Sequence, residues 1–296
     1  MPSTRPSIGY HILALVTIAV WGTTFVSTKV LLTHGLTPPE IMFYRFIIAY
    51  ALTWIFTRKV WADTWKDELL LALAGFTGGT LYFLAENTAL DYSITSNVAL
   101  VVCVTPVLTA LLTSLCYKER ITARLVVGSV VALSGVGFVV LNGTVLKIHP
   151  LGDALALVAA VAWAVYSVVI RRFDGCYTTW FVTRKVFFYG IVTMIPFIAA
   201  GMGGGLHLDK LTIPVVLGNV LFLSVLASML CFYSWNLVLE KIGTIRASNY
   251  MYTQPLVSLA CSVAVLDEPI TPIALGGTVL ILSGIYLAEH GWKKRT

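Results

Sequence analysis

Two tryptophans in the middle of apolar runs, Trp21 and Trp163, are well placed to hold a flat aromatic ligand. An indole ring packs against another aromatic ring and keeps one N–H for a hydrogen bond. Thr24 lies about one turn after Trp21, and Ser167 one turn after Trp163, so each helix would present an indole and a hydroxyl on one face. Tryptophans of a membrane-interface belt lie at the ends of apolar runs, so the central position of this pair favours a binding cavity.

A second set of candidate residues lies between positions 75 and 86. Gly75, the adjacent pair Gly78 and Gly79, Tyr82 and Glu86 recur at spacings of three and four, which places them along one stripe of a helix. Such glycines let either a neighbouring helix or a ligand approach closely. Tyr82 adds a phenol, and Glu86 adds a carboxylate that must face protein or water, because an ion facing lipid is strongly disfavoured. We expect Glu86 to bind a substrate ammonium group or to carry a proton.

Three cations within apolar runs offer Glu86 a structural alternative. Arg45, Arg184 or Lys185 can each form an ion pair with it, and Arg45 can also attract a substrate carboxylate. Arg184 and Lys185 lie near the end of their run, so for these two we expect side chains that extend to the lipid headgroups.

Two prolines, Pro106 and Pro255, interrupt apolar runs. A proline inside a helix removes one backbone hydrogen bond and frees a carbonyl about one turn earlier. Such a break can kink or gate a helix, or bind a polar substrate group. Asn97, Tyr250 and Gln254 lie within reach of these breaks and are predicted as polar substrate contacts.

These residues recur because the sequence repeats itself. Positions 149 residues apart match from 83 to 135 without a gap, with Pro, Gly and polar residues among the matches. The identical pairs are Phe83/Phe232, Asn87/Asn236, Leu90/Leu239, Thr95/Thr244, Pro106/Pro255, Glu119/Glu268, Ile121/Ile270, Thr122/Thr271, Gly128/Gly277, Val130/Val279, Leu133/Leu282, Ser134/Ser283 and Gly135/Gly284. A shift of 142 residues also places Trp21 on Trp163, so symmetry should bring these two helix faces together. In the last run of each half, glycines are predicted to form close-packing surfaces: Gly128, Gly135, Gly276, Gly277 and Gly284. Trp235 falls on the position equivalent to Glu86, and Phe83 and Trp235 complete the candidate binding set.

The composition indicates an integral membrane protein. Apolar residues make up 58% of the 296 residues and charged residues 11%, with a mean hydropathy of +0.86. Apolar runs long enough to cross a bilayer predict ten transmembrane helices. They lie at about 8–32, 40–57, 69–90, 94–117, 122–142, 151–171, 177–200, 213–239, 246–266 and 271–289.

Lys and Arg between these runs indicate the orientation. With the N-terminus in the cytoplasm, only Lys29, Lys147 and Lys210 fall on the far side, which fits the positive-inside rule and places both termini in the cytoplasm. The net charge of +6 is then a topology signal, and no nucleic-acid partner is expected. Residues 1–146 and 147–296 each hold five predicted helices. Five is odd, so the second repeat is inverted, the arrangement that underlies alternating access in transporters.

The motifs resemble those of the drug/metabolite transporter superfamily, in particular its EamA-type exporters. The resemblance rests on Trp21-Gly-Thr-Thr-Phe25, Thr105-Pro106 with Gln254-Pro255, and Lys118-Glu119-Arg120-Ile121-Thr122 with Asp267-Glu268-Pro269-Ile270-Thr271. Within the superfamily the sequence is most similar to the YddG-type exporters of aromatic amino acids. That resemblance implies a bacterial inner-membrane exporter of aromatic and other neutral amino acids.

Other functions remain alternatives. A channel would share the helical architecture, and related exporters of sugar phosphates or nucleotide sugars would need several cations near the midplane. An enzyme is not expected, because the sequence has no phosphate-binding loop and its five histidines are scattered. No cofactor or metal is expected. The expected partners are a small-molecule substrate and membrane lipid, with a monomer as the functional unit; proton coupling and simple facilitated export both stay open.

Overall fold

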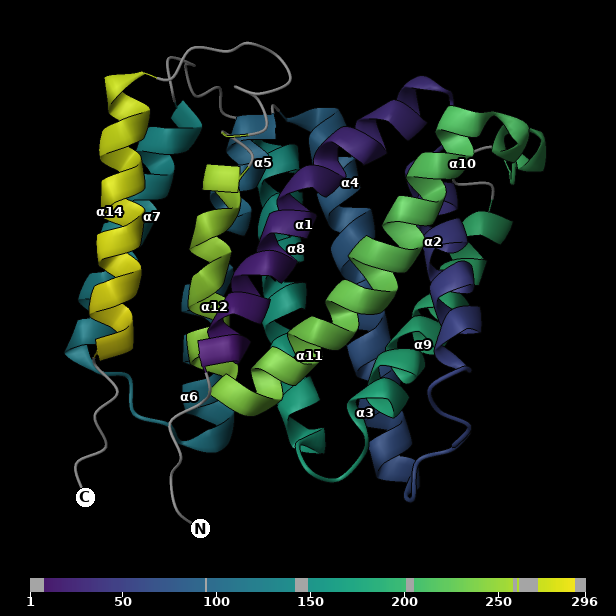
Figure 1. Cartoon of the computed structure of the whole chain (residues 1–296), viewed down its shortest axis with the longest axis horizontal. Coiled ribbons are helices and arrows are strands. Elements are labelled where there is room, and N and C mark those ends of the chain that lie inside the picture. Colours follow the sequence, from purple (N-terminus) through teal and green to yellow (C-terminus); the bar gives the residue numbers. More distant parts are fainter. Residues whose placement is uncertain are drawn as a thin grey trace.

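The computed structural model describes residues 8–93, 95–141, 149–200, 205–257, 260 and 271–290, and its regular elements within these ranges are all helices (Figure 1). The first half contains α1 Ile8–Thr33, α2 Pro38–Thr53, α3 Trp65–Gly75, η1 Phe76–Leu81, α4 Tyr82–Tyr92, α5 Thr95–Val102, α6 Thr105–Tyr117 and α7 Ala123–Leu141. The second half contains α8 Pro150–Ile170, η2 Arg171–Phe173, α9 Thr179–Ala199, η3 Leu208–Thr212, α10 Pro214–Leu221, η4 Phe222–Leu230, α11 Cys231–Ile242, α12 Thr244–Asn249, η5 Tyr250–Thr253 and α14 Pro272–His290. The prediction of an all-α protein is confirmed.

Local signals in the sequence explain several helix ends. The hydroxyl of Thr64 accepts a hydrogen bond from the backbone N–H of Asp67 and caps α3, and Thr178 caps α9 in the same way through Phe181. Lys118, with φ 55°, ends α6 in the left-handed conformation.

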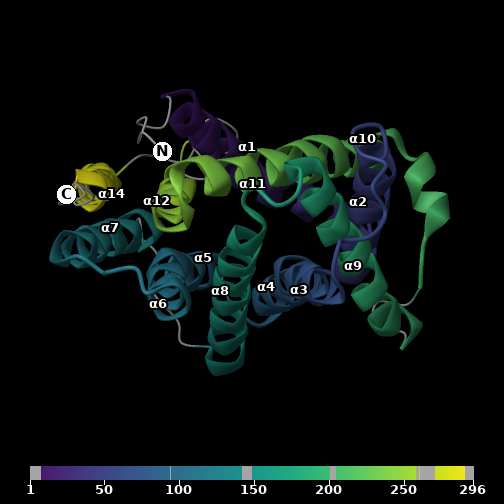
Figure 2. The same ribbon diagram turned by 90° about the horizontal axis from the view of Figure 1, so that it is seen from below.

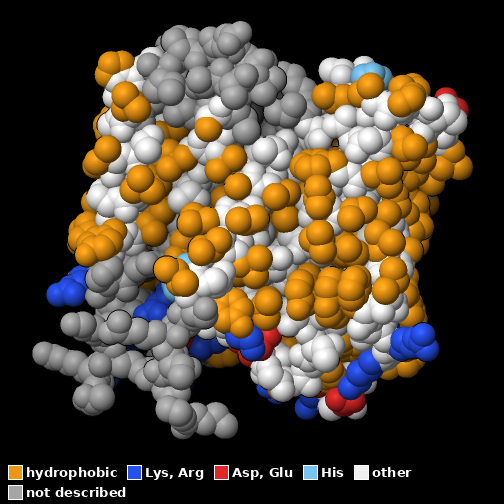
Figure 3. Space-filling view, in the orientation of Figure 1, with side chains coloured by type: hydrophobic (Ala, Val, Ile, Leu, Met, Phe, Trp, Pro, Cys, Tyr) orange, Lys and Arg blue, Asp and Glu red, His pale blue; other side chains and the backbone are white. Residues whose placement is uncertain are grey.

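Six stretches of the described chain are long and apolar enough to cross a membrane. They are Trp65–Ala89, Leu100–Tyr117, Ala123–Val140, Pro150–Phe173, Thr179–Ala199 and Pro214–Ile242. Shorter apolar helices cover Ile8–Thr24 and Leu275–Ala288. On the face drawn in Figure 3, hydrophobic side chains spread over the whole height of the bundle, whereas Lys and Arg gather at its lower edge.

The two halves interlock. α1 packs against α11, α4 against α8, and α2 against α9, so each contact joins helices from different halves of the sequence. Figure 2 shows α7 and α14 side by side at one end of the molecule, away from α2 and α9.

Glycines hold α7 and α14 at backbone contact, as the sequence predicted. A Cβ atom on Gly128 would lie 2.6 Å from the carbonyl oxygen of Gly284, and one on Gly135 would lie 2.6 Å from that of Gly277. Gly276, which we expected on the same surface, has no atom within 4 Å of such a Cβ and takes no part in this contact.

Two helices at positions related by the repeat shift each contain a π-helical segment, whose turns are wider than those of an α-helix. η1 (Phe76–Leu81) and η4 (Phe222–Leu230) are π-helical. Adding the repeat shift of 149 to 76–81 gives 225–230, which falls within η4. π-Helical turns inside α-helices are frequent at functional sites. No local pattern in the sequence predicts them.

Candidate functional site

A group of six aromatic residues, here called the central aromatic cluster, lies where helices of both halves meet. Its members are buried, at most 9% exposed, and they are Trp21, Tyr82, Phe83, Trp163, Phe232 and Trp235. The rings of Trp21 in α1 and Trp163 in α8 meet edge to face, with centroids 5.3 Å apart and planes at 87°. The repeat predicted that these two faces come together, and they do.

Each of these tryptophans also touches the other half of the chain. Trp21 contacts Trp235 and Phe232 of α11, with ring centroids 5.4 and 5.9 Å apart, and Trp163 contacts Tyr82 of α4 at 4.9 Å. A movement of one half of the chain against the other would therefore change the ring contacts within the cluster.

The cluster is closed in this conformation. An aromatic ring held between Trp21 and Trp163 needs about 7 Å between them, two contact distances of roughly 3.5 Å. The observed 5.3 Å leaves no such gap. A clamp at this position must open before a ring can enter.

Two indole N–H groups in the cluster have no acceptor in the part of the chain that the structure describes. Trp21 donates to the backbone oxygen of Ala227 in η4 at 2.9 Å. The Nε1 atoms of Trp163 and Trp235 are buried, and no acceptor for them exists among the described residues. A buried unmet donor costs about 1–3 kcal/mol, so a ligand that supplied an acceptor here would gain that energy.

Arg45 and Glu86 lie beside the cluster, each almost fully buried at 5% and 7% exposure. Nε of Arg45 donates to Oγ of Ser228 in η4 at 2.8 Å, and its guanidinium lies 4.7 Å from the centroid of the Phe83 ring. The hydroxyl of Tyr82 donates to Oε1 of Glu86 at 2.7 Å. The structural ion pair between Arg45 and Glu86, one of our alternatives, is not formed in the described part of the chain.

The expectation that Arg184 and Lys185 extend to lipid headgroups is wrong. Both are buried, at 2% and 3% exposure. Lys185 forms an ion pair with Glu68 of α3, which also accepts a hydrogen bond from the Tyr189 hydroxyl, and Nη1 of Arg184 donates to the backbone oxygen of Thr57 at 2.6 Å. The reason is that the segment after α2 folds back over α3 and α9, which gives these cations protein partners before they reach lipid.

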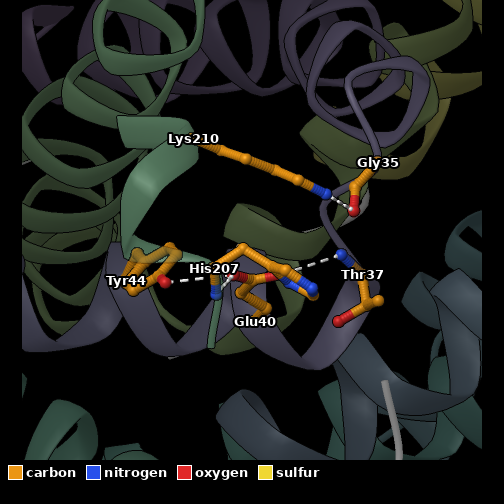
Figure 4. Close-up of polar contacts among 6 residues, drawn as sticks. All are labelled: Gly35, Thr37, Glu40, Tyr44, His207 and Lys210. Carbon is orange, nitrogen blue, oxygen red and sulfur yellow. Dashed lines mark hydrogen bonds and ion pairs between the residues drawn. The ribbon is translucent and has the colours of Figure 1, made fainter. Parts of the chain in front are cut away.

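A second buried carboxylate, Glu40, joins the start of α2 to the segment that precedes α10 (Figure 4). Glu40 is 1% exposed and accepts hydrogen bonds from the Tyr44 hydroxyl at 3.0 Å and from the backbone N–H of His207 at 2.5 Å. It also accepts from the backbone N–H of Thr37 at 3.3 Å and lies 3.2 Å from Nδ1 of His207. Since Arg184 near the start of α9 bonds Thr57, shortly after α2 ends, contacts hold α2 near both of its ends.

Three predicted contacts serve helix packing or local backbone bonding in this conformation. A Cβ on Gly79 would meet the Phe46 ring at 2.9 Å and Gly190 at 3.3 Å. The hydroxyls of Thr24 and Ser167 donate to the backbone oxygens of Trp21 and Trp163. Their part in binding stays a prediction.

The remaining predicted residues lie along the fourth and ninth runs. Pro106 lies in the first turn of α6, directly after the break between α5 and α6, and Pro255 follows the 3-10 turn η5. Tyr250 bonds Nδ1 of His11 at 2.6 Å, and the backbone oxygen of Gln254 lies close to Gly22 of α1. The side chain of Asn97 lies outside the described part of the structure.

Comparison with known proteins gives the family. A sequence profile described as the EamA-like transporter family matches residues 8–141 and again residues 150–289. The chain belongs to this family. It is thus a transporter and a multi-pass membrane protein, and the prediction of an EamA-type exporter is confirmed.

Similar proteins from other organisms carry transporter names. An "Uncharacterized transporter" of Archaeoglobus fulgidus is 29% identical over 93% of this chain and 96% of its own. A "Probable amino-acid metabolite efflux pump" of Escherichia coli K12 is 27% identical over 96% of both chains. A "Probable terminal-alkyne amino-acid exporter" of Streptantibioticus cattleyicolor is 25% identical over 93% and 92%.

A crystal structure of another protein superimposes on this EamA-like transporter with a TM-score of 0.78. The match covers 97% of this chain and 99% of the other, at 19% sequence identity, and shows the fold alone.

Sequence reasoning missed several buried polar residues of this EamA-like transporter. Glu40 had a local signal, because Thr37-Pro-Pro-Glu40 before an apolar run is the pattern of a helix-capping box. The bond between the Tyr166 hydroxyl and Oδ1 of Asn236, at 2.5 Å, had none, because it joins residues 70 positions apart.

Proposed function

We propose that this EamA-like transporter exports neutral, largely aromatic amino acids across the bacterial inner membrane by alternating access. It works as a monomer of ten helices in two inverted five-helix repeats, residues 1–146 and 147–296, with both termini in the cytoplasm. The central aromatic cluster carries the proposal: it lies between the two repeats, and two of its buried indole N–H groups have no acceptor among the described residues.

The arrangement of the helix ends supports the placement of both termini on one side of the membrane. α1 begins and α14 ends toward the lower end of the bundle in Figure 1, so the described chain starts and finishes on one side. Lys and Arg side chains gather at the same edge in Figure 3, as the positive-inside rule requires of a cytoplasmic side.

The chemistry of the cluster supports an aromatic substrate. Once the halves separate, the rings of Trp21, Trp163 and Trp235 would offer stacking and edge-to-face surfaces to a flat side chain. The names of the Escherichia coli and Streptantibioticus cattleyicolor relatives, both of which mention amino acids, point to the same substrate class.

A flux assay tests the proposal. The purified protein is reconstituted in liposomes, and counterflow of radiolabelled phenylalanine, tryptophan, threonine and a sugar phosphate is measured. We expect saturable counterflow of the amino acids, phenylalanine and tryptophan above threonine. Saturable flux of the sugar phosphate alone would reject the amino-acid assignment, and flux that neither saturates nor shows counterflow would indicate a channel.

A matched pair of tryptophan variants locates the binding site. Trp163→Ala removes a ring that is 3% exposed, and we expect it to weaken tryptophan transport about tenfold while affecting threonine less. Trp65→Ala removes a ring that is 72% exposed and serves as the control. Equal effects of the two variants on tryptophan transport would refute a role for the cluster.

A further inference from the structure

An arginine and a glutamate lie buried next to the central aromatic cluster and form no direct ion pair with each other in the described part of the chain. The described residues give the side chain of Arg45 one hydrogen bond, from Nε to Ser228, and give that of Glu86 one, from the Tyr82 hydroxyl. The two terminal nitrogens of Arg45 and the second oxygen of Glu86 have no hydrogen-bond partner within the described ranges. Each bond fixes the orientation of a charged group and leaves its outermost atoms available.

Arg45 contacts one ring of the central aromatic cluster, and Glu86 is hydrogen-bonded to another of its residues. The Arg45 guanidinium lies 4.7 Å from the centroid of Phe83, whose ring contacts that of Tyr82 at 5.0 Å. Tyr82, which bonds Glu86, lies 4.9 Å from Trp163. A cation, a carboxylate and an aromatic surface thus lie next to one another.

The energetics of burial favour a ligand that meets both charges at once. A buried charge that lacks an opposite partner is expensive, and a direct ion pair would be the simplest relief. The chain places Arg45 against the ring of Phe83 and Glu86 on the hydroxyl of the adjacent Tyr82, yet the described residues form no ion pair between the two groups. A zwitterion placed there would form two charge-assisted contacts, a fork from Arg45 to its carboxylate and one from its ammonium group to Glu86.

We propose that Arg45 and Glu86 form a two-point receptor for the α-amino acid group, with Arg45 binding the α-carboxylate and Glu86 the α-ammonium group. The side chain of the substrate then enters the central aromatic cluster. This inference rests on the proposed function and assigns its specificity: ligands with both charges are selected, and ligands with one charge leave the other protein charge buried and unmatched.

Three ligands with the same aromatic ring test the two points separately. Phenylalanine carries both charges, 2-phenylethylamine only the ammonium group, and 3-phenylpropionate only the carboxylate. Their binding to the detergent-purified protein is measured by the quenching of tryptophan fluorescence. For the unmodified protein we expect phenylalanine to bind about 10- to 100-fold more tightly than either analogue, since each lacks one charged hydrogen-bonding contact.

Two variants should each remove one point of recognition. Arg45→Gln should weaken phenylalanine and 3-phenylpropionate about tenfold or more and leave 2-phenylethylamine within about twofold. Glu86→Gln should weaken phenylalanine and 2-phenylethylamine by a similar factor and spare 3-phenylpropionate. Because each result is a ratio among ligands measured on one folded sample, a change in protein yield does not alter it.

Arg184→Gln is the matched control. Arg184 is as deeply buried as Arg45, but its Nη1 bonds the backbone of Thr57 away from the cluster, so the ratios among the three ligands should not change. If Arg45→Gln and Glu86→Gln weakened the binding of all three ligands equally, or of none, the two-point receptor would be refuted. The flux assay could still support amino-acid export in that case. Absence of amino-acid counterflow by the unmodified protein would instead overturn the proposed function itself.

Discussion

The glycine contact between α7 and α14 allows a prediction with an internal control. Replacing Gly135 by alanine would put a methyl group 2.6 Å from the backbone oxygen of Gly277 and 2.7 Å from the backbone nitrogen of Ile281. Ordinary contact begins at 3.4 Å, so the overlap is 3.4 − 2.6 = 0.8 Å against backbone atoms that cannot rotate away. The two helices must move apart by a distance of that order, which lowers the free energy of unfolding by about 1–3 kcal/mol.

Gly137 provides the comparison. It lies two residues further along α7, and a Cβ there would meet no atom within 4 Å. Both substitutions replace a helical glycine by alanine and gain the same helix propensity, up to about 1 kcal/mol. The difference between Gly135→Ala and Gly137→Ala therefore isolates the packing cost.

The assay is reversible unfolding in mixed micelles titrated with dodecyl sulfate. We expect the free energy of unfolding of Gly135→Ala to fall about 1–3 kcal/mol below that of Gly137→Ala. Ligand-affinity ratios should be the same in both variants, because the contact lies away from the central aromatic cluster. Equal unfolding free energies would show that α7 and α14 do not meet at their backbones.

Three further predictions use the same unfolding assay. Glu40→Gln should lower the free energy of unfolding by about 1–3 kcal/mol, because a buried carboxylate that accepts several hydrogen bonds becomes an amide; an unchanged value would contradict the contacts in Figure 4. Tyr166→Phe should cost about 1–3 kcal/mol by leaving Oδ1 of Asn236 without its donor, and a neutral effect would argue against that bond. Lys185→Met and Glu68→Gln should each cost about 3–5 kcal/mol, with the double variant costing less than their sum; strict additivity would mean that the two groups do not pair.

The repeat in the sequence predicted the centre of the molecule well. Identical residues at a fixed shift imply equivalent positions in two halves, so Trp21 and Trp163 were expected to face each other, and the glycines of the last helix in each half to pack closely. Both follow from symmetry and from residue type, which are properties of the sequence alone.

Structural features that depend on residues far away in the sequence could not be predicted from the sequence. The π-helical turns η1 and η4 lie at contacts with distant residues, since Tyr166 packs against Gly78 and Trp21 donates to the backbone oxygen of Ala227. Nothing in a local sequence pattern separates a π-turn from an α-turn. Arg184 and Lys185 were misplaced for the same reason. Their partners, Thr57 and Glu68, come from segments more than a hundred residues earlier, and only the folded chain brings them together.

The pairing of α7 with α14 has a consequence for how such a protein can be assembled. With the repeat shift of 149, Gly128 corresponds to Gly277 and Gly135 to Gly284, so Gly128 on Gly284 and Gly135 on Gly277 are one contact made twice. This is the self-complementary geometry of a twofold homodimer. A half-length chain inserted in both orientations would already carry this interface, and gene fusion would need only to join the two copies.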